Sequence, residues 1–159
     1  MNKCNLFYCL DVLVVKLRKF SFFLQRPRYR FTGSNISIFG PFKCKAPENV
    51  SIGSHVSIND YVYINGAGKV SIGNNVSLSA GCKIISTKLD SKNFASGGKH
   101  INKKIIIGNN VHIGAGAIVL PGVCICDNVM IGAGAVVSRS INISGVYVGV
   151  PAKFLSKDI

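Results

Sequence analysis

Acidic residues are scarce in this chain. Only 6 Asp and Glu stand against 19 Lys and Arg in 159 residues, and the formal net charge is +13. A strongly basic protein attracts anionic partners such as phosphates, acidic glycans or membrane surfaces, and charge alone does not choose among them. We expect no nucleic-acid partner. The length allows one sizeable core and not two.

The sequence also lacks the features of an exported or membrane-spanning protein. The apolar stretch near its start is interrupted by Asp11, is too short to cross a bilayer, and is not followed by a small-residue cleavage site. None of the 6 cysteines forms a CxxC pair. We interpret them as reduced packing residues of a cytosolic protein, with Cys82 and Cys124 at positions that favour a small apolar side chain.

Residues 1–30 differ from the rest of the chain. Apolar residues, among them Leu10, Leu13 and Leu17, recur at alternating three- and four-residue spacings up to Leu24, which predicts an amphipathic helix. Basic residues outnumber acids strongly in this segment. We therefore predict an N-terminal amphipathic helix with a basic linker, which either packs on the following domain or a neighbouring subunit, or contacts an anionic membrane surface.

Residues 31–159 contain a six-residue repeat. Every sixth residue from Ile107 to Ile143 is Ile or Val, and a second aliphatic ladder runs two residues ahead, from Ile105 to Ile141. This period is neither helical nor that of a simple amphipathic strand. Similar aliphatic pairs extend back through the chain, and we expect strands from about Asn35. One coil cannot bury its own aliphatics, so coils must stack, and the pattern predicts an all-β protein, a parallel β-helix.

Two insertions interrupt this repeat. Asn65–Gly68 adds two residues at a turn, and 23 residues separate Ile84 from Ile107, where the repeat has six. The larger insertion predicts an extruded loop over residues 87–104. Long ordered loops in compact domains are usually functional, so this loop is where we expect the chemistry.

Several hexads resemble those of a known family. They are IGSHVS, IGNNVS, IGNNVH, IGAGAI and IGAGAV, together with VLPGV and the closing GVPAK at residues 149–153. They are similar to the hexapeptide-repeat acyltransferases, in particular bacterial sugar O-acetyltransferases of surface-polysaccharide clusters, and the resemblance covers about residues 35–155. It implies a left-handed β-helix with three hexads per coil, a homotrimer, an acetyl-CoA site between adjacent subunits, and a catalytic histidine in the long loop.

Transfer of an acetyl group from a thioester to a sugar hydroxyl requires a base for the hydroxyl proton and donors for the developing oxyanion. It requires no covalent protein intermediate and no metal. Of the three histidines, His55 and His112 occupy turn positions within regular hexads. His112 stands where the family commonly has tryptophan, so it is a candidate for lining the donor groove. His100 lies in the inserted loop and is the candidate general base.

The loop resembles a subset of the family with the pattern ISTxLD followed by HINKPI. This chain has ISTKLD and HINKKI, with Lys104 in place of the proline. The resemblance places Asp90 and Asn102 beside His100 as orienting or acceptor-binding groups. The acidic residue that the family has near the turn at Asn65–Gly68 is absent here, which leaves the acceptor open.

Donor binding is predicted at glycine-rich turns. Ala115 and Ala133 each lie between two glycines, where minimal side chains let a ligand approach the backbone. By resemblance the pantetheine arm of acetyl-CoA lies along these turns, Ser138 and Arg139 contact the nucleotide end, and Arg139 and Lys153 supply charge to the CoA phosphates.

We therefore predict an acetyl-CoA-dependent sugar O-acetyltransferase of lipopolysaccharide, capsule or exopolysaccharide biosynthesis, cytoplasmic and peripheral at the inner membrane face. One alternative is an acetyltransferase for a small soluble acceptor, such as a nucleotide-sugar amine, a free sugar or an antibiotic. Another is a non-catalytic β-helix scaffold. A zinc hydratase of the γ-carbonic anhydrase kind would need three histidine ligands, two of them closely paired, whereas His100 and His112 are twelve residues apart.

Overall fold

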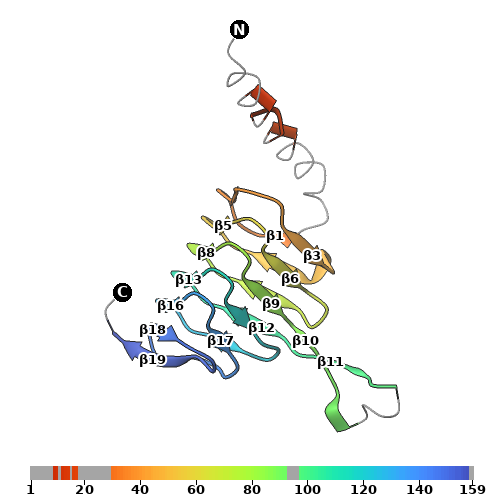
Figure 1. Cartoon of the computed structure of the whole chain (residues 1–159), viewed down its shortest axis with the longest axis vertical. Coiled ribbons are helices and arrows are strands. Elements are labelled where there is room, and N and C mark those ends of the chain that lie inside the picture. Colours follow the sequence, from red (N-terminus) through yellow and green to blue (C-terminus); the bar gives the residue numbers. More distant parts are fainter. Residues whose placement is uncertain (1–8, 11, 15, 18–29, 93–96, 158–159) are drawn as a thin grey trace.

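The computed structural model describes residues 9–10, 12–14, 16–17, 30–92 and 97–157. Its main body is a parallel β-solenoid in which the chain passes in turn through three sheets, here called sheets A, B and C, so that each coil contributes one strand to each sheet (Figure 1). Sheet A contains β1 (Arg30–Phe31), β4 (Val50–Ile52), β7 (Val70–Ile72), β12 (Ile105–Ile107) and β15 (Cys124–Ile125). The first strand thus begins earlier than the repeat pattern predicted.

The other two sheets form the remaining sides of the solenoid. Sheet B contains β2 (Ser37–Ile38), β5 (Ser57–Ile58), β8 (Val76–Leu78), β13 (Val111–Ile113), β16 (Val129–Ile131), β18 (Gly145–Val148) and β19 (Lys153–Ser156). Sheet C contains β3 (Lys43–Lys45), β6 (Tyr63–Asn65), β9 (Lys83–Ile85), β14 (Ile118–Val119) and β17 (Val136–Val137). A short 3-10 helix, η2 (Pro47–Asn49), precedes β4. Within the three sheets, parallel pairing prevails and β18 with β19 is antiparallel.

The interior is filled by the two predicted aliphatic ladders. In β12, Ile105 and Ile107 are fully buried, whereas Ile106 between them is 38% exposed. Strand pairing places like residues above one another from coil to coil, as in Ile107 above Ile125. The parallel β-helix prediction is confirmed, because alternate residues of each short strand point inward and stack on the same residue type in the next coil.

The ladder prediction fails at its C-terminal end. Ile143 is 62% exposed, and Tyr147 occupies the next interior position, because β18 pairs with β16 so that Tyr147 lies beside Ile131. The Tyr147 hydroxyl donates a hydrogen bond to the Ile143 carbonyl over 2.8 Å. The packing prediction holds for Cys82, which is buried, and is wrong for Cys124, which is exposed as the outward residue between two inward ones.

The corner between sheets A and B is built from residues whose backbone is in the left-handed conformation. Asn75, Asn110 and Asn128 have φ of 54°, 54° and 57°, and their side-chain amides form a ladder from coil to coil, with Asn75 Nδ2 donating to Asn110 Oδ1 over 2.9 Å. Asparagine tolerates this conformation better than most residues. His55 has the same conformation at φ 57°, which agrees with a structural role in the turn.

The inserted segment forms an antiparallel hairpin of β10 (Thr87–Leu89) and β11 (His100–Asn102). It leaves the solenoid between sheets C and A and extends away from the stacked coils (Figure 1). The predicted extruded loop over residues 87–104 is therefore a structured arm.

At the other end, residues 9–10, 12–14 and 16–17 are helical, and Leu10, Leu13 and Leu17 are 47%, 51% and 57% exposed. Among the described residues, no helix has the length and apolar character needed to cross a membrane. The predicted helix over residues 1–24 otherwise lies outside the described residues.

Candidate active site

The hairpin carries the three predicted residues His100, Asn102 and Asp90 and places the first two on one face. In the register of β10 and β11, His100 lies opposite Leu89 and Asn102 lies opposite Thr87. Because side chains alternate along a strand, His100 and Asn102 project from the same face of the hairpin. Asp90 follows Leu89 and lies across from Lys99 at the end of the ladder, so its side chain points to the opposite face of the hairpin from His100. The His100 side chain is exposed.

Asp90 organises the far end of this hairpin. Its backbone N–H donates to the Lys99 carbonyl over 2.8 Å, and its Oδ1 accepts a hydrogen bond from the Lys92 backbone N–H over 3.0 Å. The carboxylate therefore holds the turn that begins at residue 90.

The root of the hairpin is fixed by a serine that sequence reasoning missed. Ser86 is fully buried, and its hydroxyl donates to the Asn65 carbonyl and accepts from the Gly68 N–H, the latter over 2.8 Å. Its carbonyl accepts from the Lys103 N–H over 2.8 Å. A Cβ on Gly68 would overlap the backbone of Ser86 and Lys103, so this turn requires glycine. The sequence did contain a signal for it, because Ser86 directly precedes the insertion at residues 87–104 and contacts the insertion at residues 65–68.

The corner between sheets B and C, here called the donor corner, is nearly free of side chains. Ala115 and Ala133 stack there, with the Gly134 N–H donating to the Ala115 carbonyl over 2.8 Å. Gly116 and Gly134 have φ of 66° and 68°, and no atom lies within 4 Å of where a Cβ would be on either. Gly81, one coil earlier, has the same conformation and the same open surroundings. A ligand can therefore approach the backbone over three successive coils.

Lys153 reaches the same corner. The Gly149 carbonyl accepts from the Val136 N–H over 3.0 Å, and the Ala152 N–H donates to the Val136 carbonyl over 2.8 Å, so the closing GVPAK segment lies beneath sheet C. Lys153 then pairs with Val148 at the end of β18. Lys153 is exposed and lies on the last coil, beyond the one that carries Ala133.

Ser138 and Arg139 lie elsewhere. Both are exposed and follow β17 at the corner between sheets C and A. Five residues separate Ala133 from Ser138, which at full extension span at most about 17 Å. The structure therefore divides the predicted donor set, with Ala115, Ala133 and Lys153 at the donor corner and Ser138 and Arg139 across sheet C.

His112 is half-buried on the outer face of β13. Its Nε2 lies 3.4 Å from the Ser79 hydroxyl, a residue that leads directly into the donor corner. At that distance the hydrogen bond is weak. His112 is thus placed beside the donor corner and away from the hairpin. Among residues 30–92 and 97–157, no three His, Cys, Asp or Glu side chains gather as a metal site would require.

The stacked six-residue coils form the parallel β-solenoid of a hexapeptide-repeat protein. The family model "Bacterial transferase hexapeptide (six repeats)" matches residues 104–139. Nodulation protein L of Rhizobium meliloti (strain 1021) is 36% identical over 122 residues, which cover 76% of this chain and 67% of the relative. The chain belongs to the bacterial hexapeptide-repeat acyltransferases.

Solved structures agree with this assignment. The chain is similar to a maltose O-acetyltransferase from Clostridium difficile 630, with a TM-score of 0.75 and 31% identity over 83% of this chain and 71% of that one. It is also similar to a galactoside acetyltransferase solved in complex with coenzyme A, with a TM-score of 0.77 and 30% identity over 80% of this chain and 64% of that one.

Proposed function

We propose that the protein transfers an acetyl group from acetyl-CoA to a saccharide hydroxyl in the biosynthesis of lipopolysaccharide, capsule or exopolysaccharide. The observation that carries this proposal is the pairing of an exposed histidine, His100, on a projecting hairpin with a bare donor corner. The similarity to a maltose O-acetyltransferase and to a galactoside acetyltransferase that binds coenzyme A supports it.

In this proposal the His100 imidazole accepts the proton of the attacking hydroxyl. The hydroxyl oxygen forms an ester bond with the thioester carbonyl carbon, the carbon–sulfur bond breaks, and the imidazolium returns its proton to the leaving thiolate. Asp90 positions the hairpin and Asn102, on the same face as His100, binds the acceptor. Ala115 and Ala133 leave room for the pantetheine arm, while Lys153 and, from across sheet C, Ser138 and Arg139 bind the nucleotide end.

The site is proposed to form between subunits of a homotrimer. The hairpin leaves the solenoid between sheets C and A, whereas Ala115 and Ala133 lie at the corner between sheets B and C. The width of sheet C separates the two in one chain. A neighbouring copy that offers its donor corner to the hairpin would unite them, and this head-to-tail contact closes into a ring under threefold symmetry.

Complementation tests this arrangement. His100→Ala removes the base, and Ala133→Trp blocks the donor corner with an exposed side chain that does not enter the core. Each variant alone should be inactive in a thiol-release assay with acetyl-CoA. Random mixed trimers of the two should recover roughly a quarter of wild-type activity, because one interface in four combines an intact hairpin with an intact donor corner.

Two results would contradict the proposal. If the His100→Ala variant retains full activity, His100 is not the base. If mixed trimers stay inactive although mass spectrometry shows that they contain both variants, the site lies within one chain. The acceptor is tested by the same assay across nucleotide sugars and isolated glycans, and acetylation of amines alone would overturn the assignment to hydroxyl groups.

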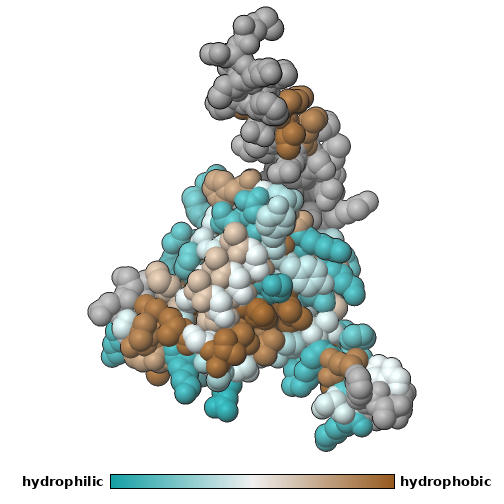
Figure 2. Space-filling model, in the orientation of Figure 1, coloured by the Kyte–Doolittle hydropathy of each residue, from teal (hydrophilic) through white to brown (hydrophobic). Residues whose placement is uncertain are grey.

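We also propose peripheral contact with an anionic membrane at its inner face. Three leucines of the helical residues, Leu10, Leu13 and Leu17, are about half exposed. Figure 2 shows hydrophobic residues at the surface of this segment. Residues 1–30 contain seven basic residues and one acid, which complements anionic lipids. The protein should co-sediment with phosphatidylglycerol vesicles and not with phosphatidylcholine vesicles. Leu13→Asp should abolish this, and equal binding of the variant would refute the proposal.

A further inference from the structure

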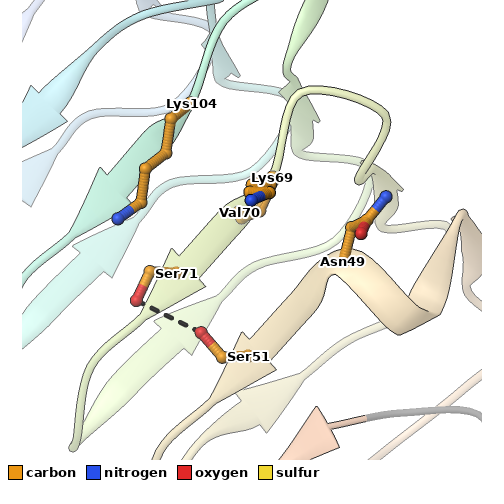
Figure 3. Close-up of a pocket in the computed structure, with 6 residues that line it drawn as sticks. All are labelled: Asn49, Ser51, Lys69, Val70, Ser71 and Lys104. Carbon is orange, nitrogen blue, oxygen red and sulfur yellow. Dashed lines mark hydrogen bonds between the residues drawn. The ribbon is translucent and has the colours of Figure 1, made fainter.

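A shallow depression of about 190 Å³ lies on the outer face of sheet A, near the corner from which the hairpin leaves (Figure 3). Its lining consists of Asn49, Ser51, Lys69, Val70, Ser71 and Lys104. We call it the lysine depression. Five of its six lining residues are polar, and two of them carry a positive charge. Three separate segments meet there: residues 49–51 of η2 and β4, residues 69–71 of β7 and the turn before it, and Lys104 in the link before β12.

The polar groups of the lysine depression are arranged to donate hydrogen bonds. The Ser51 hydroxyl donates to the Ser71 hydroxyl over 3.2 Å, which leaves the Ser71 proton free to donate outward. Lys69 and Lys104 are both exposed, and across the described parts of the chain no carboxylate lies within 4.0 Å of either ammonium group. Glu48 precedes Asn49 in the chain and does not line the depression. This set of groups suits an oxyanion.

The lysine depression lies at the root of the arm that carries His100. The Ile105 N–H donates to the Lys69 carbonyl over 3.0 Å, which joins the β11–β12 link to the turn before β7. Lys104 follows His100 by four residues, so their Cα atoms are at most about 14 Å apart. A charged group held in the depression would therefore leave the rest of its molecule within reach of the hairpin.

The volume of the lysine depression suits a single charged group and is too small for a complete saccharide. Pockets for complete small molecules usually enclose about 300–1,000 Å³, and the lysine depression is smaller than that range. It has room for one phosphate or carboxylate with a few waters, since a water occupies about 30 Å³ in the liquid. Most of a saccharide would have to lie outside it.

We propose that the lysine depression binds an oxyanion carried by the saccharide acceptor, either a phosphate or a carboxylate. This inference rests on the proposed acetyl transfer to a saccharide and adds that the saccharide is acidic. It also gives a role to Lys104, which replaces a proline in the resembling pattern and contributes one of the two charges.

Equilibrium binding tests the site without turnover. The probes are glucose 1-phosphate, glucuronic acid and uncharged glucose, titrated by calorimetry into the full chain. The test protein is Lys69→Gln/Lys104→Gln. The control is Lys83→Gln, because Lys83 is equally exposed but lies on β9 of sheet C. Wild type and control should bind at least one charged probe at least tenfold more tightly than the double variant does. The better charged probe identifies phosphate or carboxylate as the source.

The outcomes separate this inference from the proposed function. Equal binding of the charged probes by the double variant and the Lys83→Gln control would overturn it, as would a wild type that does not prefer them to glucose. A double variant that loses affinity for acetyl-CoA in place of the charged sugars would also overturn it, because the depression would then serve the CoA phosphates. If the charged probes bind as expected but no saccharide is acetylated, the anion site stands and the proposed acetyl transfer fails.

Discussion

Ser86→Ala tests whether the buried serine anchors the hairpin. The substitution removes a hydroxyl that is fully buried and that serves both the Gly68 N–H and the Asn65 carbonyl. The Asn65 carbonyl keeps a second partner, the Ser86 backbone N–H at 3.3 Å. The Gly68 N–H loses its partner inside a half-buried turn. The main penalty is therefore one unpaired backbone donor.

An unpaired buried donor costs about 1–3 kcal/mol, and the half-burial of Gly68 places this case at about 1–2 kcal/mol. For a chain of this size each kcal/mol lowers the melting temperature by about 2–4 °C. Urea unfolding followed by circular dichroism measures the loss directly as a shift of the midpoint.

Ser77→Ala is the matched control. Ser77 accepts a hydrogen bond from Ser57 over 3.0 Å on the outer face of sheet B, where water can replace it, so its loss should cost under about 0.5 kcal/mol. The reasoning is refuted if the two alanine variants unfold at the same urea concentration, or if Ser86→Ala is as stable as wild type.

Two further predictions concern the solenoid itself. Ile131→Ala, at a fully buried position, should lower the free energy of unfolding by about 2–5 kcal/mol. Met130→Ala, on the outer face of the same strand, should lower it far less. Similar urea midpoints for the two variants would contradict the assignment of Ile131 to the interior and Met130 to the outer face. Hydrogen bonds from the backbone N–H and the side-chain amide of Asn109 lower the pKa of the Asp127 carboxyl below its ordinary value near 3.8. A carboxyl whose pKa is lowered in the folded state stabilises the fold at pH values above its unfolded pKa, and this stabilisation is lost as the pH falls. The melting temperature of wild type should therefore fall relative to that of Asp127→Asn below about pH 4. Melting temperatures of the two proteins that change in parallel from pH 7 to pH 3 would count against this.

The repeat was predictable because the residue types along each strand indicate which of its side chains are buried. Val50 and Ile52 of β4 point inward and Ser51 between them points outward, so the alternation in burial coincides with an alternation in residue type along the chain. The prediction failed at Ile143 because Ile141 pairs with Ile125 and takes the interior place that the six-residue step assigns to Ile143. It failed at Cys124 because cysteine is compatible with either side of a strand.

Among the candidate site residues, local sequence was enough to place His100, Asp90 and Asn102 on one hairpin. All three lie in one insertion, and an insertion between two stacked coils must leave the body and return to it. The sequence could not show that Arg139 and Lys153 lie on opposite sides of sheet C, because both are exposed basic residues. The structure separates them by the width of sheet C.

The sequence by itself determined the stacked coils, the position of the insertion and the bare glycine turns, because period, length and side-chain size are properties of neighbouring residues. Only the tertiary structure decided that Ala115, Ala133 and Lys153 share one corner while the hairpin leaves from another, and that Lys69 and Lys104 face one depression. These relations depend on how 16 to 35 residues close each coil, and the register between coils is set by pairing across all three sheets.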